Sequence, residues 1–124
     1  MKYLLATLSA LCLISPLANA GSPTHMWKCQ LNDDLSEEQV LKHAAEWKKA
    51  AATLPGGDAI TQQIHFPVAV GADGLGTDLI YTVKWPSFAA YGAFWDVYPD
   101  SDAAGMEGET MSCHGSALWE TAEI

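Results

Sequence analysis

Residues 26–57 read MWKCQLNDDLSEEQVLKHAAEWKKAAATLPGG, and this stretch decides the fold because a strand pattern passes directly into a helix pattern. Its first six residues alternate between apolar and polar side chains, which is typical of a half-buried strand. Ser36 then provides an N-cap, and Gln39 three residues later completes a capping box. The predicted buried stripe of this helix consists of Val40, Ala44, Trp47, Ala51 and Leu54. The Pro-Gly-Gly sequence from Pro55 onward ends the helix.

The rest of the chain predicts three further strands and a second helix. We expect strands over 60–70 and 77–85, joined by a glycine-rich hairpin loop, with Pro67 marking an edge strand or a bulge. A second helix follows Pro86, and its expected buried line is Phe88, Tyr91, Trp95 and Tyr98, with Phe94 off that line. An acidic loop over 99–109 leads to a last strand over 111–119. On this strand Cys113, Ala117 and Trp119 are expected on one face, and Ser112, His114 and Ser116 on the other.

The order of these elements is β-α-β-β-α-β, which predicts an α+β, ferredoxin-like fold. Such a domain has an antiparallel four-stranded sheet with two helices on one face. Its first and last strands are neighbours, so Cys29 and Cys113 would lie on adjacent strands. The other sheet face would be polar but carry few charges. That face can be solvated, or it can close against a second copy of the chain.

The N-terminal residues 1–20 have the pattern of a secretory signal peptide. Lys2 precedes a short apolar run, and Ala18-Asn19-Ala20 offers small residues for cleavage after Ala20. We therefore expect a periplasmic or secreted protein whose single domain spans residues 21–124. Cleavage also removes Cys12 and leaves an even pair of cysteines in an oxidising compartment, which favours a Cys29–Cys113 disulfide over a catalytic thiol.

Composition limits the partners of this chain. Lys2 is the only charged residue in the signal segment, so the formal charge of −9 becomes −10 after cleavage. Such an acidic surface disfavours nucleic acid and anionic membranes as partners, and we expect no membrane association after cleavage. It is compatible with a neutral or cationic ligand, or simply with solubility.

Two histidines are the candidate catalytic residues, and each has a structural alternative. His43 lies near the apolar stripe of the first helix, where it could act as a general base in a pocket or be a hydrogen-bonded core residue. His65 and His114 fall on the two predicted edge strands, too far apart to act together within one copy. A dimer could bring one toward the partner's other, although solvent-exposed histidines would give the same pattern. His25 in the lead segment has no assigned place.

Aromatic residues are abundant for a domain of this size, and most of them must build the core. The second helix has more aromatic side chains than one buried stripe needs, so a surplus could line a ligand pocket or a dimer contact. The candidate ligand-binding residues are Trp47, Tyr81, Tyr91, Trp95 and His114.

No motif in the sequence predicts a metal or an organic cofactor, and we expect none. The segment from Asp100 begins like a calcium loop, but Ala104 and Met111 replace two oxygen donors that an EF-hand requires. Nucleophile-elbow, phosphate-loop and dinucleotide-binding patterns are not found. An enzyme whose residues converge only in three dimensions would show no such motif, so catalysis stays open.

By its order of elements, the region 26–124 resembles the dimeric α/β-barrel superfamily. This superfamily includes antibiotic-biosynthesis-type cofactor-independent monooxygenases and NIPSNAP-like proteins. The resemblance implies a homodimer in which two sheets pair into a barrel and small hydrophobic or aromatic ligands bind in pockets. Three functions follow as hypotheses: an exported binder of a small apolar or aromatic molecule, a cofactor-independent monooxygenase or isomerase, and a non-catalytic envelope or stress-related interaction module.

Overall fold

The computed structural model describes residues 21–124 and confirms the predicted order of strands and helices. The strands are β1 (Ser22–Leu31), β2 (Thr61–His65), β3 (Leu79–Lys84) and β4 (Met111–Thr121). The helices are α1 (Glu37–Ala51), α2 (Phe88–Val97) and the short α3 (Asp102–Gly105), with a 3-10 turn η1 (Tyr98–Asp100) between the last two. The predicted signal peptide lies outside the described residues.

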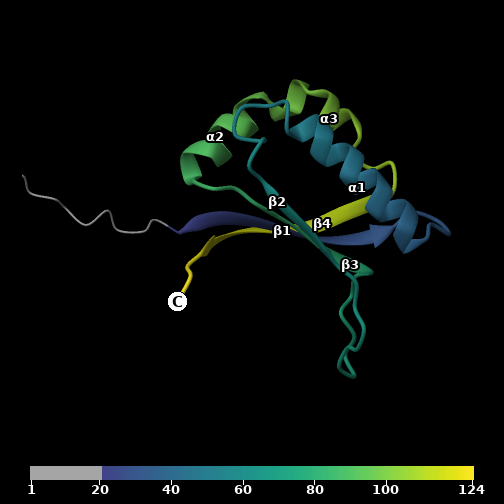
Figure 1. The fold of residues 1–124 in the computed structure, drawn as a ribbon. Helices are drawn as coiled ribbons and strands as arrows, with labels where there is room; N and C mark the ends of the chain where they lie inside the picture. The colour runs from purple at the N-terminus through teal and green to yellow at the C-terminus, as the bar shows by residue number, and fades with distance from the viewer. Residues whose placement is uncertain (1–20) are drawn as a thin grey trace, which may run out of the picture.

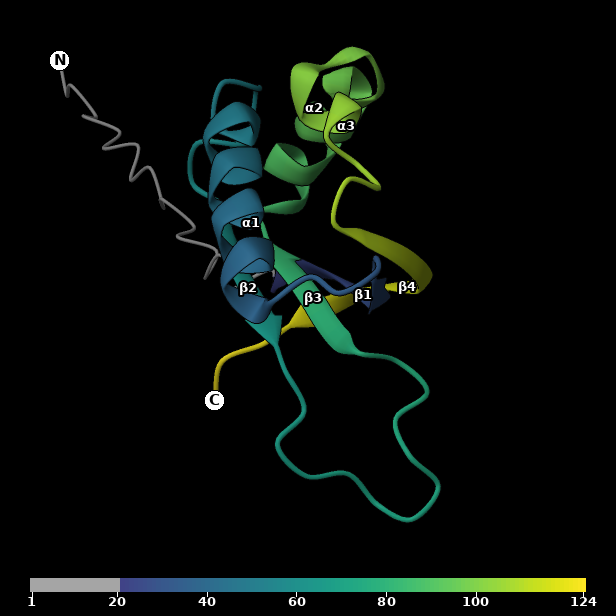
Figure 2. The same cartoon turned by 90° about the vertical axis from the view of Figure 1, so that its right-hand side faces the viewer.

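The four strands form one antiparallel sheet in the order β2-β3-β1-β4. All helices lie on one side of this sheet (Figure 1), and the view from the right-hand side shows α1 beside α2 and α3 above the strands (Figure 2). This is the ferredoxin-like fold that the sequence predicts. We call the uncovered side of the sheet the open face. None of the helices in residues 21–124 is long and apolar enough to cross a membrane.

The capped helix α1 forms as predicted. The Ser36 side chain accepts a hydrogen bond from the Gln39 backbone, and the Gln39 side chain accepts one from the Ser36 backbone. Two acidic residues in the first turn and two lysines in the last turn complement the helix dipole. Val40, Ala44 and Ala51 are buried against the sheet, so the predicted apolar stripe is the packed face.

The buried line of α2 differs from the sequence prediction. Phe94, expected off the main line, is completely buried against Trp85, whereas Phe88 is 45% exposed. Phe88 is the first residue of the helix, so it lies beyond the edge of the core that Phe94 enters. The predicted acidic loop is also partly helical, because η1 and α3 interrupt it and bury Ala103.

Cys29 and Cys113 form a disulfide between β1 and β4, as predicted. They are directly opposite in the antiparallel register, with Cα atoms 4.0 Å apart. Since 84 residues separate them in sequence, the bond joins the two ends of the described fold.

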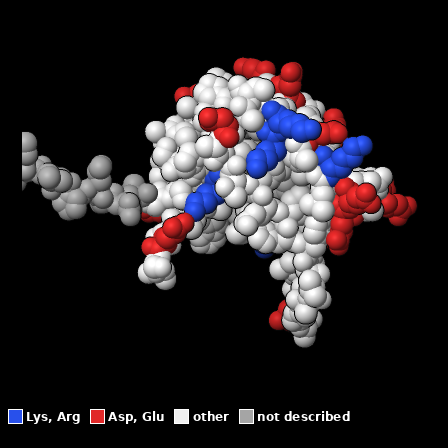
Figure 3. Space-filling view, in the orientation of Figure 1, with Lys and Arg blue, Asp and Glu red and all other residues white. Residues whose placement is uncertain are grey.

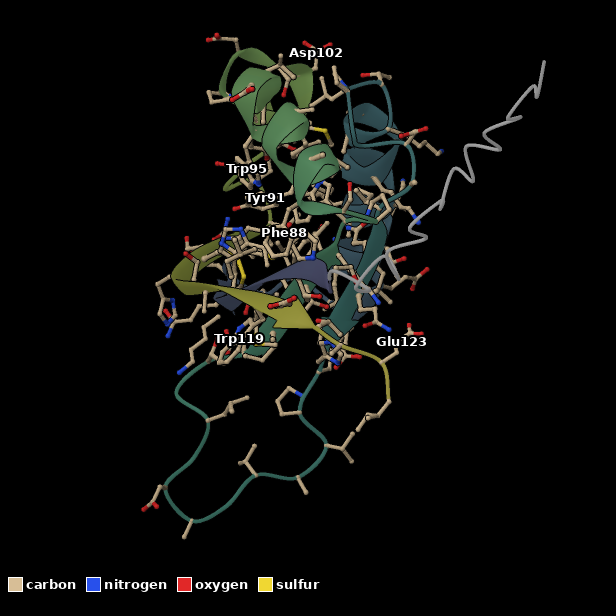
Figure 4. The ribbon with its side chains drawn as sticks, turned by 90° about the vertical axis from the view of Figure 1, so that its left-hand side faces the viewer. Phe88, Tyr91, Trp95, Asp102, Trp119 and Glu123 are labelled. Atoms are coloured by element: carbon tan, nitrogen blue, oxygen red, sulfur yellow. A yellow bond between two sulfur atoms is a disulfide. The ribbon has the colours of Figure 1, made fainter. Side chains whose placement is uncertain are left out.

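A bulge in β4 changes which side chains share a face, and here the prediction is wrong. Lys28 pairs with His114 but the preceding residue, Trp27, pairs with Ser116, so Gly115 is the extra residue. Gly115 has a φ of +57°, a conformation that glycine adopts without strain. Beyond the bulge the alternation is reversed, so Ser116 lies on the helix side. Ala117 and Trp119 lie on the open face instead, and Figure 4 shows Trp119 on the side of the sheet opposite α2.

The strand β2 ends at His65, five residues before its predicted end at Val70. Pro67 comes directly after Phe66 and cannot donate a ladder hydrogen bond, so the chain leaves the sheet there. Residues 66–78 form a long loop that projects from the sheet on the side away from the helices (Figures 1 and 2). At the other end, β1 begins at Ser22 rather than Met26, which brings His25 into the sheet.

Candidate functional site

A cavity of about 470 Å³ lies between the helix side of the sheet and the helices that cover it. Its residues come from β1, α1, β3 and the position after it, α2, η1, the segment 106–110 and the first residues of β4. Its walls include the aromatic residues Trp27, Trp47, Tyr81, Trp85, Phe94, Trp95 and Tyr98. No lysine or arginine is among the lining residues of this described cavity, and Glu107 contributes a carboxylate.

The aromatic walls are held by edge-to-face contacts. Trp47 is close to perpendicular to Tyr81, at 88° with ring centroids 6.2 Å apart. Trp95 contacts Tyr98 in the same manner, with centroids 4.8 Å apart. This geometry is the favoured one for aromatic pairs, because the positive edge of one ring meets the negative face of the other. The cavity is therefore walled by aromatic rings that contact one another.

A chain of hydrogen bonds crosses one wall. The Trp47 Nε1 donates to the Tyr98 hydroxyl at 3.1 Å, and that hydroxyl donates to Glu107 Oε1 at 2.6 Å. Burial raises the pKa of the Tyr98 phenol, and the hydrogen bond to Glu107 raises it further. Tyr98 therefore stays protonated at neutral pH and connects the indole of α1 to the carboxylate on the β4 side.

Tyr81 is fixed in a second polar contact on the sheet. The Gln62 side-chain amide donates to the Tyr81 hydroxyl and to the Ala44 carbonyl oxygen, the latter at 3.0 Å. Burial raises the pKa of Tyr81, and the hydrogen bond from Gln62 opposes this by a smaller amount. The phenol is neutral and keeps its own proton available for donation.

His43 lines the cavity, but both of its ring nitrogens face protein acceptors. Its Nε2 lies 3.2 Å from the Met106 carbonyl oxygen, and its Nδ1 lies 3.4 Å from Glu109 Oε2. A carbonyl oxygen only accepts, so Nε2 is the donor in the first contact. The ring thereby connects α1 to the 106–109 segment that forms one wall, and a general-base role would require breaking one of these contacts.

His25, which the sequence left without a place, belongs to the edge of this site. Its ring stacks on Trp27 at a centroid distance of 3.9 Å, and its Nδ1 lies 3.3 Å from the Tyr91 hydroxyl. Burial lowers the pKa of His25, which favours the neutral ring, and the ring shares a hydrogen bond with the Tyr91 hydroxyl. The signal that could have found it is the outward extension of the period-2 pattern, since His25 is two residues before Trp27.

The structure separates the predicted site residues into two groups. His43, Trp47, Tyr81 and Trp95 line the cavity, whereas Tyr91 lies beside it, bonded to His25. The second group, His65 and His114, lies on the open face, on the two opposite edge strands. His65 lies 3.4 Å from the Thr82 hydroxyl and lines a shallow hydroxyl-rich hollow of about 600 Å³. Residues 21–124 contain no cluster of three side chains that could hold a metal ion.

Three buried polar atoms have no hydrogen-bond partner in the described residues. They are the indole nitrogens of Trp85 and Trp95 and the hydroxyl of Thr110, and all three residues line the cavity. None of these atoms has accessible surface, so a ligand would reach them only if the wall shifted. The accessible surface of the cavity is therefore characterised mainly by its shape and its aromatic lining.

Several solved structures share this fold. A protein from Shewanella loihica PV-4 that was provisionally assigned as a monooxygenase matches 85% of this chain and 98% of its own, with a TM-score of 0.54 and 18% sequence identity. A dimeric ferredoxin-like protein of unknown function from Thermobifida fusca YX matches 83% of this chain and 93% of its own, with a TM-score of 0.54 and 14% identity. At identities this low, the structural agreement shows a common fold and nothing further.

A third match, provisionally assigned as a chlorite dismutase, is larger, since this chain covers 44% of it, with a TM-score of 0.51 and 12% identity. No protein-family model matches the sequence, and no curated protein sequence is significantly similar. The structural matches confirm the ferredoxin-like fold of this chain.

Proposed function

We propose that this chain is an exported domain that binds a small apolar or aromatic molecule in the cavity between α1, α2 and the sheet. The aromatic lining of the 470 Å³ cavity is the observation that carries the proposal. Cavities of ~300–1,000 Å³ with apolar walls and few polar groups are typical of small-molecule sites. Because the lining includes a carboxylate and no lysine or arginine, a neutral or cationic ligand fits better than an anion.

The test is a calorimetric titration of the protein with 1-naphthol, 1-naphthylmethylamine and 1-naphthoate. We expect saturable binding of the first two and at least about tenfold weaker binding of the carboxylate, which is ~1.4 kcal/mol. The variant Ala44→Leu fills the cavity and should abolish binding, while Ala45→Leu is its matched control on the exposed side of α1. Equal binding by the two variants would exclude the cavity as the site.

The enzyme alternative has one specific support, the hydrogen bond between Tyr98 and Glu107 on the cavity wall. That pair could deliver or remove a proton at a bound phenol, as a cofactor-independent monooxygenase would need. The fold shared with the Shewanella protein is compatible with this activity. Oxygen uptake with 1-naphthol as substrate, lost in Tyr98→Phe but retained in Tyr91→Phe, would support catalysis. If the protein binds 1-naphthol but takes up no oxygen, the enzyme alternative is contradicted and only the binding function is supported.

We also propose a homodimer that pairs the two open faces. The open-face residues are Thr24, Met26, Lys28, Gln30, Thr61, Gln63, His65, Ile80, Thr82, Lys84, Ser112, His114, Ala117, Trp119 and Thr121. Trp119 is 55% exposed there, which is unusual for a large aromatic residue that has no partner to cover it. The dimeric state of the Thermobifida protein supports the proposal. Analytical ultracentrifugation tests it, and a monomer at all concentrations would contradict it.

Export is the remaining part of the proposal, and the disulfide supports it. Disulfides persist in oxidising compartments and are rare in the cytosol. Mass spectrometry of protein recovered from the periplasm or medium should give the mass of a chain that begins at Gly21, two hydrogens lighter than the fully reduced chain. An intact N-terminus or free thiols would contradict this prediction.

A further inference from the structure

We propose that residues 66–78, here named the arm, form a clasp that packs against the Trp119 end of the open face of a second copy of the chain. This inference rests on the proposed homodimer and goes beyond it, because it names the segment and the contact that hold the two copies together. The arm connects β2 to β3 and contains Pro67, which removes the chain from the sheet.

The arm exposes aliphatic side chains that the described residues do not cover. Val68 is 101% exposed, Val70 54% and Leu75 39%. Three glycines accompany them, and the hydrogen bond from the Gly74 N–H to the Gly71 carbonyl oxygen, 2.9 Å, closes a turn at the tip. Several exposed aliphatic residues on one projecting loop mark a surface that another molecule covers.

The direction of the arm identifies the face on which its partner lies. Figures 1 and 2 show the arm leaving the sheet on the side opposite the helices, which is the open face. At the other end of the strands, the C-terminal segment projects from the sheet on the same side (Figure 1). A molecule seated on the open face would therefore contact the arm as well.

The charges of the arm exclude two other kinds of partner. Its only charged residues are Asp73 and Asp78, and Figure 3 shows an almost uncharged projection, whereas lysines are visible over α1. An acidic, lysine-free loop would be repelled by anionic lipid and by nucleic acid. An uncharged protein surface with an exposed apolar group fits the arm better than either of these.

The strand register places an exposed apolar group, Trp119, at the end of the open face that lies opposite the arm. The arm leaves β2 and enters β3 at the end where His65 pairs with Ile80. Trp119 pairs with Thr24, which is also paired with Lys84, the last residue of β3. Hence Trp119 and the arm lie at opposite ends of the open face.

A two-fold axis that lies between two facing sheets and crosses their strands obliquely brings each arm, which leaves the β2–β3 side of one sheet, to Trp119 on β4 of the other. The same contact then occurs twice, as an isologous interface requires. A two-fold axis parallel to the strands would instead bring the two arms to the same end of the dimer and leave both Trp119 side chains at the opposite end, out of reach of the arms. The exposed apolar groups on this face are thus complementary to a second copy of the same face.

Sedimentation equilibrium of the full protein tests the clasp. The triple variant Val68→Ser, Val70→Ser, Leu75→Ser should weaken the dimer by at least about tenfold, because truncation of central apolar contacts has effects of this size. The matched control is Leu41→Ser with Val97→Ser, which removes exposed aliphatic side chains from α1 and α2 and should leave the dimer unchanged. Circular dichroism spectra verify that the variants fold.

The possible results separate the clasp from the dimer itself. A wild-type monomer would overturn both proposals, and a wild-type dimer with equal dissociation constants for arm variant and wild type would overturn only the clasp. An independent readout comes from a photocrosslinking residue at position 70. Mixing nitrogen-14 and nitrogen-15 chains in one dimer distinguishes crosslinks between chains from crosslinks within a chain. We expect crosslinks between chains at the peptide that contains Trp119. Crosslinks only within a chain, or between chains at α1 or α2, would contradict the proposal.

Discussion

At the scale of single residues, the site is defined by hydrogen-bonding groups held among aromatic rings. Tyr98 accepts a hydrogen bond from Trp47 and donates one to Glu107, and Gln62 anchors Tyr81. His43 Nε2 donates to the Met106 carbonyl oxygen, and its Nδ1 lies 3.4 Å from Glu109 Oε2. The polar groups of the cavity thus mainly hold its walls in place. A ligand could use only the hydrogen-bonding positions of the tyrosines and Glu107 that these contacts leave free.

The tyrosines give a pH prediction. Residues 21–124 contain Tyr81, Tyr91 and Tyr98, and burial raises the pKa of each above the usual 10.0. The unfolded chain therefore loses these protons first as the pH rises, so the free energy of unfolding falls above about pH 10. Ultraviolet absorbance at 295 nm should show little tyrosinate in the folded protein at pH 10 and about half ionisation in urea. Half-ionised tyrosines in the folded protein would contradict this.

His43 gives a second residue-scale prediction. Replacing it with Ala removes the contact to Met106 and should destabilise the protein by ~1 kcal/mol, since one net hydrogen bond is lost. Hydrogen exchange should become faster at residues 106–110 in this variant. His43→Gln can still donate to the Met106 carbonyl and should recover part of the loss. If His43→Ala left exchange unchanged in this segment, the ring would not be the group that fixes the wall.

At the scale of elements, the sequence predicts regular structure well where local signals agree and fails where one residue interrupts the pattern. The capping box and stripe predict α1 closely, because N-cap chemistry and apolar periodicity are both local. At Gly115 a bulge exchanges the faces on which the following β4 side chains lie. A glycine in a strand sequence does not by itself predict such a bulge. Pro67 predicts a break in the strand, but how far the chain then departs from the sheet depends on the packing of the whole 66–78 loop.

The candidate site shows the same division. Trp47 and His43 are predictable as pocket residues because they lie on the apolar side of a clear helix. The contributions of Glu107 and the 106–113 wall are not, because they depend on how η1 and α3 return the chain to β4. The prediction for Phe94 is wrong because an aromatic-rich helix offers more than one consistent apolar line.

The bulge makes an element-scale prediction. Gly115→Ala places a Cβ 3.8 Å from the Lys28 side chain, an ordinary contact, so the cost is the positive φ alone. We expect a loss of stability of ~1 kcal/mol, measured by urea denaturation. Gly92→Ala is the matched control: the space around Gly92 is open and it lies inside α2, so alanine should stabilise the protein by up to ~1 kcal/mol. Equal effects of the two substitutions would show that the bulge carries no strain constraint.

The disulfide between β1 and β4 gives a second prediction at the scale of elements. The double substitution Cys29→Ala with Cys113→Ala should lower the free energy of unfolding by ~2–5 kcal/mol, because it releases a long constrained loop in the unfolded chain. Reduction of the wild type with dithiothreitol should give a similar loss in the same denaturation experiment. An unchanged denaturation midpoint after verified reduction would show that the β1–β4 ladder is stable without the bond.

At the scale of the whole molecule, the two sides of the sheet differ. The helix side holds an aromatic cavity, and the open face carries the exposed Trp119. In the proposed account, the domain binds a ligand on the first side and a second copy on the other, so the same surface is not used twice. All five tryptophans of the sequence lie in the described residues, four around the cavity and one on the open face, so they report on the two sides separately.

The most direct test of ligand binding in the cavity uses the five indole N–H signals in a nitrogen–proton correlation spectrum. On titration with 1-naphthol, the signals of Trp27, Trp47, Trp85 and Trp95 should shift together and saturate. The signal of Trp119, on the opposite side of the sheet, should stay in place. Movement of Trp119 alone, or of no indole signal at saturating ligand, would contradict the proposed function.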